Sequence, residues 1–566
     1  MSAPLRIANC SGFYGDRLSA AREMVEGGPI DVLTGDWLAE LTMLILAGNQ
    51  LKGRPGYAPT FLTQLEQVLG QCQERGIRIV SNAGGLDPAG CARAVADLAT
   101  RLGLHGLRIA HVTGDDVRAQ AEPGTVTANA YLGGRPIAAA LAAGADVVVT
   151  GRVTDAALVT GPGMWRHGWG SGDLDALAGS VVAGHVIECG CQATGGNYAF
   201  FEEVPDLAHC GFPIAELHAD GSAVITKHPG TGGLVSVGTV TAQLLYEISS
   251  PRYPGPDVTA RFDTIQLTQQ APDRVLISGV TGEPPPETLK VAVNRLGGYR
   301  NTMTLVLTGL DLAEKARLAE EAVWARVPKE SFERTHVDLT PLDAGTALLR
   351  ITVMDQDRKR AGRAFSSAVV ETGLASYPGL YGLTPPGDAS AYGVYTPSSI
   401  SRDQVRVRVC LDGREIPVPD ADPPRPQPEP PHVSDGLPYG THVGPWTSAG
   451  LPLPAAELPE EIVPLGRIAG ARSGDKGGDA NLGVWVRTPE EYAWLSDFLT
   501  VERLRDLLPE VRDLPVERFV LPNLLALNFV VSGLLGLGVA ASPRLDPQAK
   551  ALGERLRSAM VPSPGL

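Results

Sequence analysis

Leu5-Arg-Ile-Ala-Asn-Cys-Ser-Gly12 is an apolar run that ends abruptly in short polar residues and glycine. The same order, apolar residues followed by polar and glycine-rich ones, recurs along the first part of the chain. In a parallel α/β sheet the carboxyl ends of the strands lie along one edge, and ligands bind in the crevice outside them. These segments are therefore expected to converge on one site. Their polar residues are Asn9, Ser11, Asp36, Asn82, Asp115, Asp116, Arg152, Asp155 and the residues of a sixth segment, Glu188 to Asn197.

Length and composition narrow the class of protein. The chain has 566 residues, which implies roughly two to four domains. Hydrophobic residues make up 43% and charged residues 20%, which is typical of a globular protein. Asp and Glu outnumber Lys and Arg by 63 to 48, giving a formal charge of −15. This balance argues against a nucleic-acid partner.

The termini and the cysteines indicate a cytoplasmic protein without a membrane partner. The first residues enter a strand at once and lack the apolar core of a signal peptide. The longest apolar stretch, Leu524 to Ala541, contains Asn528 and several glycines, which favours a buried strand, loop and helix over a membrane span. Seven cysteines spread over a long chain do not form a disulfide framework, so we expect reduced thiols.

The pattern of elements divides the chain into four parts. Residues 1–215 alternate short strands with helices, which predicts a mostly parallel sheet, and residues 216–411 read as an α+β region packed on it. Residues 412–460 are rich in proline and predict a semi-rigid linker. Residues 461–566 fit a two-layer α+β sandwich. Helices are expected at Ala20–Glu26, Leu38–Gln50, Thr60–Arg75, Pro88–Leu102 and Ile137–Ala143, with a short turn from Asp155 ended by Gly161-Pro162-Gly163.

Several longer motifs resemble one known family. They are Ala8-Asn-Cys-Ser-Gly-Phe-Tyr-Gly-Asp16, Thr34-Gly-Asp-Trp-Leu-Ala-Glu-Leu-Thr-Met43, Thr150-Gly-Arg-Val-Thr-Asp-Ala-Ala-Leu158, Gly184-His-Val-Ile-Glu-Cys-Gly190 and the segment His228 to Val240. Over about residues 5–410 the chain resembles the acyclic terpene utilisation family AtuA. Ala471-Arg-Ser-Gly-Asp-Lys-Gly-Gly-Asp-Ala-Asn481 resembles the small ferredoxin-fold domain that accompanies that core.

The resemblance implies a fold and a metabolic setting, but no catalytic residues. It implies an α/β core followed by a C-terminal ferredoxin-like α+β sandwich. The family is associated with bacterial catabolism of citronellol and geraniol, a pathway run on coenzyme A thioesters of branched acids. The resemblance therefore implies a small acid or its acyl-CoA thioester as the ligand.

The segment from Glu188 to Asn197 allows two interpretations. Cys189 is either a nucleophile with His185 as its base, since residues four apart face the same side of a helix, or a small residue packing a strand end. Cys189 and Cys191 are too close together for a structural zinc knuckle.

The segment from Thr150 to Asp155 is also ambiguous. Arg152 sits where an anion would bind, and Arg binds carboxylate or phosphate through paired donors. The alternative is a structural ion pair beside a helix cap formed by Asp155 or Thr154. Asp36 has the same ambiguity, because it could cap the helix expected from Leu38.

The carboxylates at the strand ends could divide general acid and base work through separated pKa values, or bind a divalent metal such as Mg²⁺. We favour the first use, with Asp36, Asp155 and Glu188 as the acid/base candidates. A glycine-rich turn from His228 to Gly233, preceded by Lys227, is either an anion nest or a plain connection. Neither a P-loop nor a dinucleotide fingerprint occurs, so neither ATP nor NAD is expected.

The segment Arg472 to Asn481 is the densest cluster of functional groups in the last domain. We interpret it as a loop. The loop is either a clamp for phosphate or carboxylate or a connection whose polar groups bond to its own backbone. As a clamp, it could complete the site of a neighbouring subunit. The predicted ligand-binding residues are Asn9, Ser11, Asn82, Arg152, Asn197, Arg472, Asp475, Lys476 and Asn481.

The leading hypothesis is a lyase, hydratase or hydrolase that acts on a small acid or its acyl-CoA thioester, without nicotinamide or ATP. The alternative is a non-catalytic ligand-binding or assembly subunit of an acyl-CoA-processing complex. A homo-oligomer is expected in either case.

Overall fold

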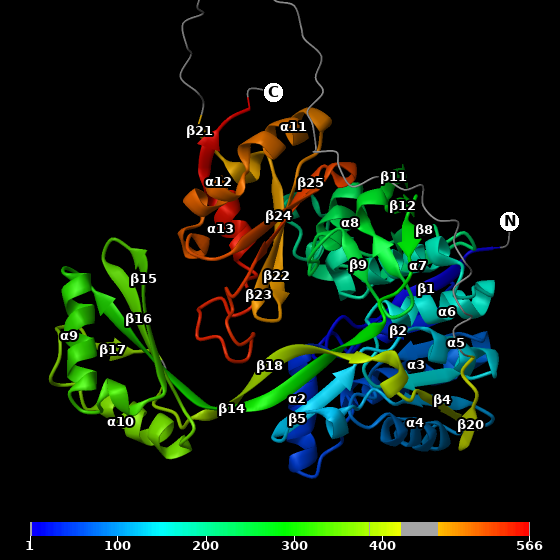
Figure 1. Cartoon of the computed structure of the whole chain (residues 1–566), viewed down its shortest axis with the longest axis horizontal. Helices are drawn as coiled ribbons and strands as arrows, with labels where there is room; N and C mark the ends of the chain where they lie inside the picture. The colour runs from blue at the N-terminus through cyan, green and yellow to red at the C-terminus, as the bar shows by residue number, and fades with distance from the viewer. Residues whose placement is uncertain (1–2, 384, 420–461, 565–566) are drawn as a thin grey trace, which may run out of the picture.

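A computed structural model describes residues 3–383, 385–419 and 462–564. At its centre lies the parallel part of a large mixed sheet (Figure 1). Neighbouring parallel strands are joined in the order β1-β2-β3-β6-β4, so the five predicted strand ends lie along one edge. These strands are β1 (Leu5–Asn9), β2 (Val32–Gly35), β3 (Arg78–Ser81), β4 (Ile109–Thr113) and β6 (Val147–Thr150).

Antiparallel strands extend this sheet on both sides. Beyond β1 come β7 (Pro213–Leu217), β8 (Ala223–Lys227), β12 (Arg274–Ser278) and β11 (Gln266–Ala271). Beyond β4 come β19 (Arg408–Leu411) and β20 (Arg414–Ile416). The boundary proposed at residue 215 lies within β7, so the main sheet runs across it. The α/β class with a mostly parallel core is confirmed for the centre of the sheet.

Helices cover both faces of the sheet because its strands are apolar on both sides. Ala8, Leu33 and Ile79 belong to the core on one face, and Ile7, Val32 and Val80 to the core on the other. The first core is covered by α1 (Ala20–Glu26), α3 (Pro59–Arg75) and α4 (Pro88–Arg101). The second is covered by α5 (Arg135–Ala142), α6 (Ala157–His167), α7 (Leu174–Ile187) and α8 (Val237–Leu244).

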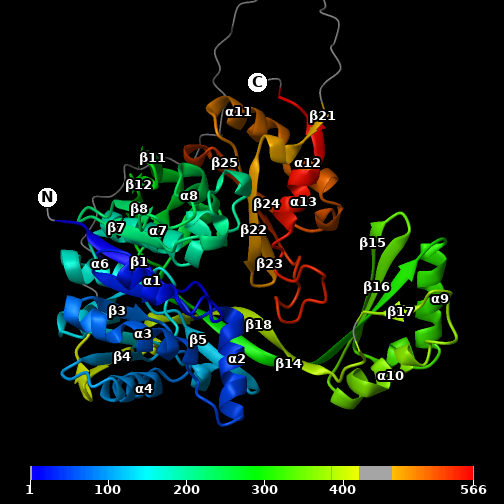
Figure 2. The same ribbon diagram turned by 180° about the vertical axis from the view of Figure 1, so that it is seen from behind.

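A lobe projects to one side of the molecule on a single long strand (Figures 1 and 2). The first half of β14 (Thr288–Thr308) pairs with β5 (Thr125–Ala130), and β18 (Ser390–Ser401) pairs along much of its length. Its second half enters the lobe, where it pairs with β16 (Thr346–Asp355) and β17 (Tyr381–Gly382). The lobe also contains β15 (Arg334–Asp343), α9 (Leu312–Trp324) and α10 (Phe365–Val370), and has its own apolar core.

The C-terminal domain is the expected two-layer sandwich. Its antiparallel sheet has the order β22-β23-β25-β24, formed by β22 (Gly470–Lys476), β23 (Asp479–Trp485), β24 (Val516–Leu521) and β25 (Ala526–Val531). The helices are α11 (Pro489–Phe498), α12 (Val501–Leu507) and α13 (Leu552–Ser558), and β21 (Ile462–Pro464) pairs with β26 (Met560–Pro562). Smaller elements elsewhere are α2 (Glu40–Leu51), β9 (Arg252–Pro254), β10 (Thr259–Arg261) and β13 (Thr281–Glu283).

The C-terminal domain packs directly on the α/β domain. Trp485 stacks on Tyr198, with ring centroids 6.2 Å apart and planes 20° apart. The Asn523 amide donates to the carbonyls of Phe262 and Ile265 at 2.9 and 3.0 Å. Leu521, Leu524 and Ala526 belong to the same apolar core as the α/β domain. Within the described residues, no helix is both long and apolar enough to cross a membrane.

Three local predictions were wrong. The segment starting at Glu188 follows helix α7 rather than a strand, because the apolar run before it is a fully buried helix. Gly161-Pro162-Gly163 does not end the turn after Asp155. It lies inside α6, where its glycines allow close packing: a Cβ on Gly161 would lie 2.6 Å from Ile137 and one on Gly163 2.5 Å from Trp169.

The third wrong prediction concerns residues 472–481, which form the β22–β23 hairpin rather than a loop. Of the segment 412–460 that was interpreted as a linker, Arg414–Ile416 forms β20 of the main sheet, and residues 420–460 lie outside the described residues.

Candidate functional site

Polar side chains at the ends of β2 and β3 contact one another as expected. Asn82 donates its amide N–H to Asp36 Oδ1 at 2.6 Å and accepts the Trp37 N–H at 2.8 Å. The same Asp36 oxygen accepts the Leu38 N–H at 2.8 Å. Asp36 therefore holds the turn before α2 from within a buried cluster, but it does not cap that helix, which begins at Glu40 with Ala39 at its N-cap.

Arg152 lies at the centre of the cluster and is only 4% exposed. Its Nη2 lies 3.1 Å from Asp155 Oδ1, and its Nη1 donates to the Leu38 carbonyl at 2.7 Å. Its guanidinium carbon lies 4.2 Å from the ring centroid of Tyr131, and its backbone N–H donates to Asp115 Oδ2 at 2.9 Å. The guanidinium is thus held between an aromatic ring and a carboxylate.

Glu188 reaches the cluster from the C-terminal end of α7. Its backbone carbonyl accepts the amide N–H of Asn9, at the end of β1, at 3.4 Å. Asn9 in turn accepts the Ser11 N–H at 3.0 Å, which shapes the loop after β1. This loop passes so close to α7 that a Cβ on Gly12 would lie 2.5 Å from the Gly190 nitrogen. Asn9 and Ser11 therefore join the end of β1 to Glu188.

The hydrogen bonds of His185 fix the chemistry of its contact with Glu188. His185 Nε2 lies 3.1 Å from the Gln243 carbonyl, which can only accept, so Nε2 carries the proton. Burial, followed by the charge of Lys476, lowers the pKa of His185 to about 4, so the ring is neutral near pH 7. Its Nδ1 is then a lone-pair acceptor, and it lies 3.3 Å from Glu188 Oε1. Only a protonated Glu188 can donate across this contact.

Burial raises the pKa of both Glu188 and Asp36 well above the ordinary range, and the charge of Asp155 raises them further. The nearby Arg152 acts in the opposite direction on both carboxyls. Burial also raises the pKa of Asp115 to about 6. The cluster therefore combines carboxyl groups whose burial favours the protonated form with the ion pair between Asp155 and Arg152.

The C-terminal domain contributes two cationic side chains, Arg472 and Lys476, at its contact with the α/β domain. Arg472, at 9% exposure, donates to the Gln192 side-chain oxygen and places its guanidinium carbon 4.4 Å from the Tyr246 ring centroid. Lys476 Nζ donates to the Glu247 carbonyl at 2.6 Å and lies 5.8 Å from the Tyr253 ring centroid. Asn481 is fully buried against the turn that contains Glu247, which follows α8. The hairpin thus faces the α/β domain of its own chain.

Other predicted residues lie in different surroundings. Asn197 is exposed in a turn with φ of 58°, at the rim rather than within the buried cluster. Asp475 is half-buried at the end of β22. Burial, with the charges of Glu188 and Glu247, raises the pKa of the Cys189 thiol well above its ordinary value. This setting favours Glu188 over Cys189 as the partner of His185.

The side chains of the glycine-rich turn after β8 make contacts that stabilise the fold. Lys227 Nζ lies 3.1 Å from Asp273 and donates to the Thr231 carbonyl at 2.8 Å, while His228 Nε2 lies 2.9 Å from the Met24 carbonyl. These contacts favour the plain connection over an anion nest. Asp116 forms an exposed ion pair with Arg118 at 2.6 Å.

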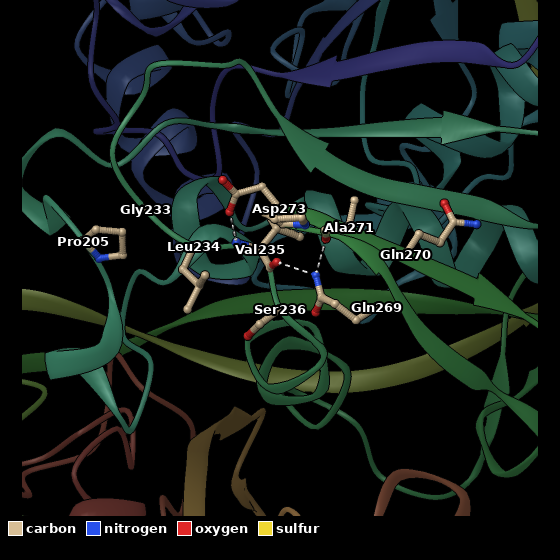
Figure 3. A pocket seen from close by; sticks show the side chains of 10 residues that line it. Pro205, Gly233, Leu234, Val235, Ser236, Gln269, Gln270, Ala271 and Asp273 are labelled. Atoms are coloured by element: carbon tan, nitrogen blue, oxygen red, sulfur yellow. Dashed lines mark hydrogen bonds between the residues drawn. The ribbon is translucent and has the colours of Figure 1, made fainter.

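An open hollow of about 500 Å³ lies elsewhere, beside β11 and β12 (Figure 3). Two of its polar side chains bind the hollow's own backbone: Gln269 donates to the carbonyls of Val235 and Ala271, and Asp273 accepts the Val235 N–H. The acid cluster is formed by Asp36, Asn82, Arg152, Asp155, His185 and Glu188. None of these residues lines the hollow. We therefore place the candidate site at the acid cluster and not in this hollow.

In the part of the chain that the structure describes, no three His, Cys, Asp or Glu side chains are grouped so as to hold a metal ion. The convergent carboxylates instead contact nitrogen groups: Asp36 accepts from Asn82, Asp155 pairs with Arg152, and Glu188 faces His185. The donor set is therefore better suited to moving protons than to holding Mg²⁺.

Three residues of the cluster were not predicted from the sequence. Tyr131 stacks on Arg152, Tyr253 lies with its ring centroid 5.5 Å from that of His185, and the charge of Glu247 acts on Glu188. Each stands in an ordinary sequence context, without a motif around it. Of the three, only Tyr131 could have been found from the sequence, because it directly follows strand β5, as the other candidates follow their strands.

Comparison with known proteins agrees with this architecture. Residues 5–411 match the family described as acyclic terpene utilisation family protein AtuA, and residues 463–562 match the AtuA ferredoxin-like domain. Searches of curated proteins and of solved structures found no match. The first match covers more than half of the chain and the second identifies its last domain, so the chain belongs to the acyclic terpene utilisation family AtuA.

Proposed function

We propose that the chain is an enzyme that uses buried acid and base groups on a small branched acid, or its coenzyme A thioester, in acyclic terpene utilisation. Hydration, lyase chemistry and thioester hydrolysis all fit, because each needs a proton delivered to one atom and removed from another. The family supports the metabolic setting. The buried cluster supports the class of chemistry.

The observation that carries the proposal is the contact between Glu188 and His185. A carboxylic acid with a raised pKa can act as a general acid, and burial beside the neutral imidazole of His185 favours the protonated form of Glu188. In the proposed reaction Glu188 gives its proton to an oxygen of the substrate. The Asp155 carboxylate, paired with Arg152, accepts a proton from water or from the substrate. Asp36 is the second buried acid.

Cations from two domains surround these acids. Arg152 belongs to the α/β domain, whereas Arg472 and Lys476 come from the ferredoxin-like hairpin. Guanidinium and ammonium groups in a site of low dielectric bind carboxylate or phosphate more strongly than they do in water. We propose that they hold the anionic part of the ligand.

Binding is tested first, by a thermal-shift screen of the full chain with coenzyme A, straight and branched acyl-CoAs, free branched acids and inorganic phosphate. A ligand that binds only the native state raises Tm. The proposal expects a rise with a branched acid or its thioester that exceeds the rise with phosphate at the same concentration. A response to phosphate alone would contradict it.

Chemistry is tested next with Glu188→Gln, which keeps the shape of the side chain but cannot give up a proton. For the ligand found in the screen, we expect kcat to fall by at least about 100-fold, the usual contribution of a general acid, while the Tm rise persists. Glu314→Gln, at an exposed acid of α9 in the lobe, is the matched control and should retain full activity. Equal kcat in the Glu188 variant and the control would refute the assignment.

A further inference from the structure

Two cysteines that lie 19 residues apart in the sequence contact each other in the fold. Cys191 lies in the short helical turn Gly190–Thr194, soon after Glu188, and Cys210 lies just before β7. The Cys191 thiol donates to the Cys210 carbonyl at 3.3 Å, and the Cys210 sulfur lies 3.8 Å from the Cys191 carbonyl. The two thiols also share a hydrogen bond. Each sulfur therefore lies against the other residue.

The surroundings of Cys210 favour a thiolate. Thr194 Oγ1 lies 3.2 Å from its sulfur, and Arg17 donates to its carbonyl at 2.9 Å. The hydrogen bond with Cys191 lowers the pKa of the Cys210 thiol; burial opposes this effect, and Thr194 and Arg17 add to it. The same hydrogen bond, together with burial, raises the pKa of Cys191. Because the thiolate is the reactive form, Cys210 is the nucleophile of the pair and Cys191 keeps its proton.

The pair is also accessible to a small reagent. Cys191 is half-buried, whereas Cys210 is only 5% exposed. Cys72 and Cys91, by contrast, are fully buried in an apolar core, and burial raises the pKa of both thiols. Oxidation of cysteine follows thiolate character and exposure. The pair combines both properties, but its burial selects a reagent close to water in size.

We propose that Cys191 and Cys210 are a redox modification site, a dithiol that a small peroxide converts to a disulfide. In reducing cell compartments such disulfides are usually transient or redox-sensing. The bond would join the segment that follows Glu188 to the start of β7. Gln192, next to Cys191, accepts from Arg472, so this segment also contacts the C-terminal domain. The proposal does not rest on the function proposed above.

The reaction has two steps. The Cys210 thiolate attacks one oxygen of the peroxide, the O–O bond breaks, and the other oxygen takes a proton and leaves as water or an alcohol. Cys210 is then a sulfenic acid. The Cys191 sulfur attacks the sulfenic sulfur, the S–S bond forms, and the hydroxyl leaves as water with the Cys191 proton. The peroxide gains two electrons and the two thiols lose them.

The test treats the native full chain with a small molar excess of hydrogen peroxide, then counts thiols after denaturation. We expect wild type to lose two of its seven thiols and to recover both with dithiothreitol. Digestion after glutamate cuts the chain between the two cysteines, at Glu202 and Glu203. Mass spectrometry should then find the peptides of Cys191 and Cys210 joined, and separated again by reduction.

Four variants identify the partners. Cys191→Ser and Cys210→Ser should each abolish the joined peptides, and in Cys191→Ser the reaction should stop at a Cys210 sulfenic acid that dimedone labels. Cys189→Ser, at the neighbouring cysteine, and Cys410→Ser, at another half-buried one, should form the bond as wild type does. A wild-type protein that keeps all seven thiols, or that joins a different pair, would overturn the proposal. The wild-type result decides the question even where a variant fails to fold.

Discussion

At the scale of single residues, the site depends on a histidine that stays neutral. If His185 were protonated, its Nδ1 would donate to Glu188 and stabilise the carboxylate. Because burial and the charge of Lys476 lower the pKa of His185, Nδ1 carries a lone pair and lies 3.3 Å from Glu188 Oε1. The raised pKa of Glu188 favours a proton on this carboxyl, from which a substrate can take it. One hydrogen bond to the Gln243 carbonyl selects this tautomer.

Asp115 offers a stability test at the same scale. Its pKa is raised to about 6 in the folded protein, against about 3.9 in an unfolded chain. The folded state therefore binds the proton more tightly. The stabilisation that results is complete below about pH 4 and is lost as the pH rises through about 6. Asn at this position can still accept from the Arg152 N–H and from Asn129 through one oxygen, the arrangement that Asp115 Oδ2 has now.

We therefore expect Asp115→Asn to become more stable relative to wild type as the pH is raised from about 4 to about 7.5, by on the order of 3 kcal/mol. Urea unfolding of both proteins at the two pH values measures this difference. If the difference between the two proteins is the same at both pH values, Asp115 does not have a raised pKa.

The sequence grouped the residues near the parallel strands better than those at the contact between the two domains. Asp36, Arg152 and Asp155 follow apolar strands, and the geometry of a parallel sheet alone brings them together. Glu247 follows a short helix in an ordinary segment, and Asn481, which accepts its backbone N–H, is distant in the sequence. This contact is tertiary, so no local pattern encodes it.

At the scale of elements, the residues of the β22–β23 hairpin favour a loop by their local propensity, although they form two strands. Arg472-Ser-Gly-Asp-Lys-Gly-Gly-Asp479 is rich in glycine and charge, which favours a loop over a strand. The hairpin forms because Gly474 and Gly483 allow it to approach Tyr246 and Leu245, so tertiary packing outweighs local propensity. The cluster was singled out from the sequence as a loop, and the structure shows a hairpin instead.

The close approach of the hairpin gives a direct mutational test. Gly483→Ala places a methyl group 2.4 Å from the Leu245 Cβ, so one of the two domains must shift. We expect a loss of about 1–3 kcal/mol, as for other overpacked interiors, measured by thermal or urea unfolding. Gly48→Ala, within helix α2, meets no atom within 4 Å and should be neutral or slightly stabilising. Equal stability of the two variants would mean that the domains do not pack as described.

At the scale of the whole molecule, the lobe and the C-terminal domain each have an apolar core of their own, and Trp485, Leu521, Leu524 and Ala526 also join the C-terminal domain to the core of the α/β domain. The lobe connects to the body through β14 and β18 and stands apart in both views (Figures 1 and 2). Units with separate cores open separately, each with its own free energy.

Hydrogen exchange read by mass spectrometry should therefore show a common opening free energy for peptides of β15, β16 and α9. We expect this free energy to be lower than that of β1 to β3. The C-terminal domain has a core of its own, but Trp485 and Ala526, at the ends of β23 and β25, lie in the core of the α/β domain. Peptides of β23 and β25 should therefore open with a free energy closer to that of the α/β domain than to that of the lobe. A lobe that opens only with global unfolding would argue against separate units.

If the buried cluster performs chemistry, a ligand that binds there leaves the protein changed. This is measured by the mass of the bound ligand after incubation with the full chain in ¹⁸O-labelled water. We expect wild type to change this mass, by gain or loss of water, by cleavage or by release of coenzyme A. The double variant Asp36→Asn, Glu188→Gln should bind the ligand and return it intact. A wild-type protein that binds the ligand and returns it unchanged would be a binding subunit and not an enzyme.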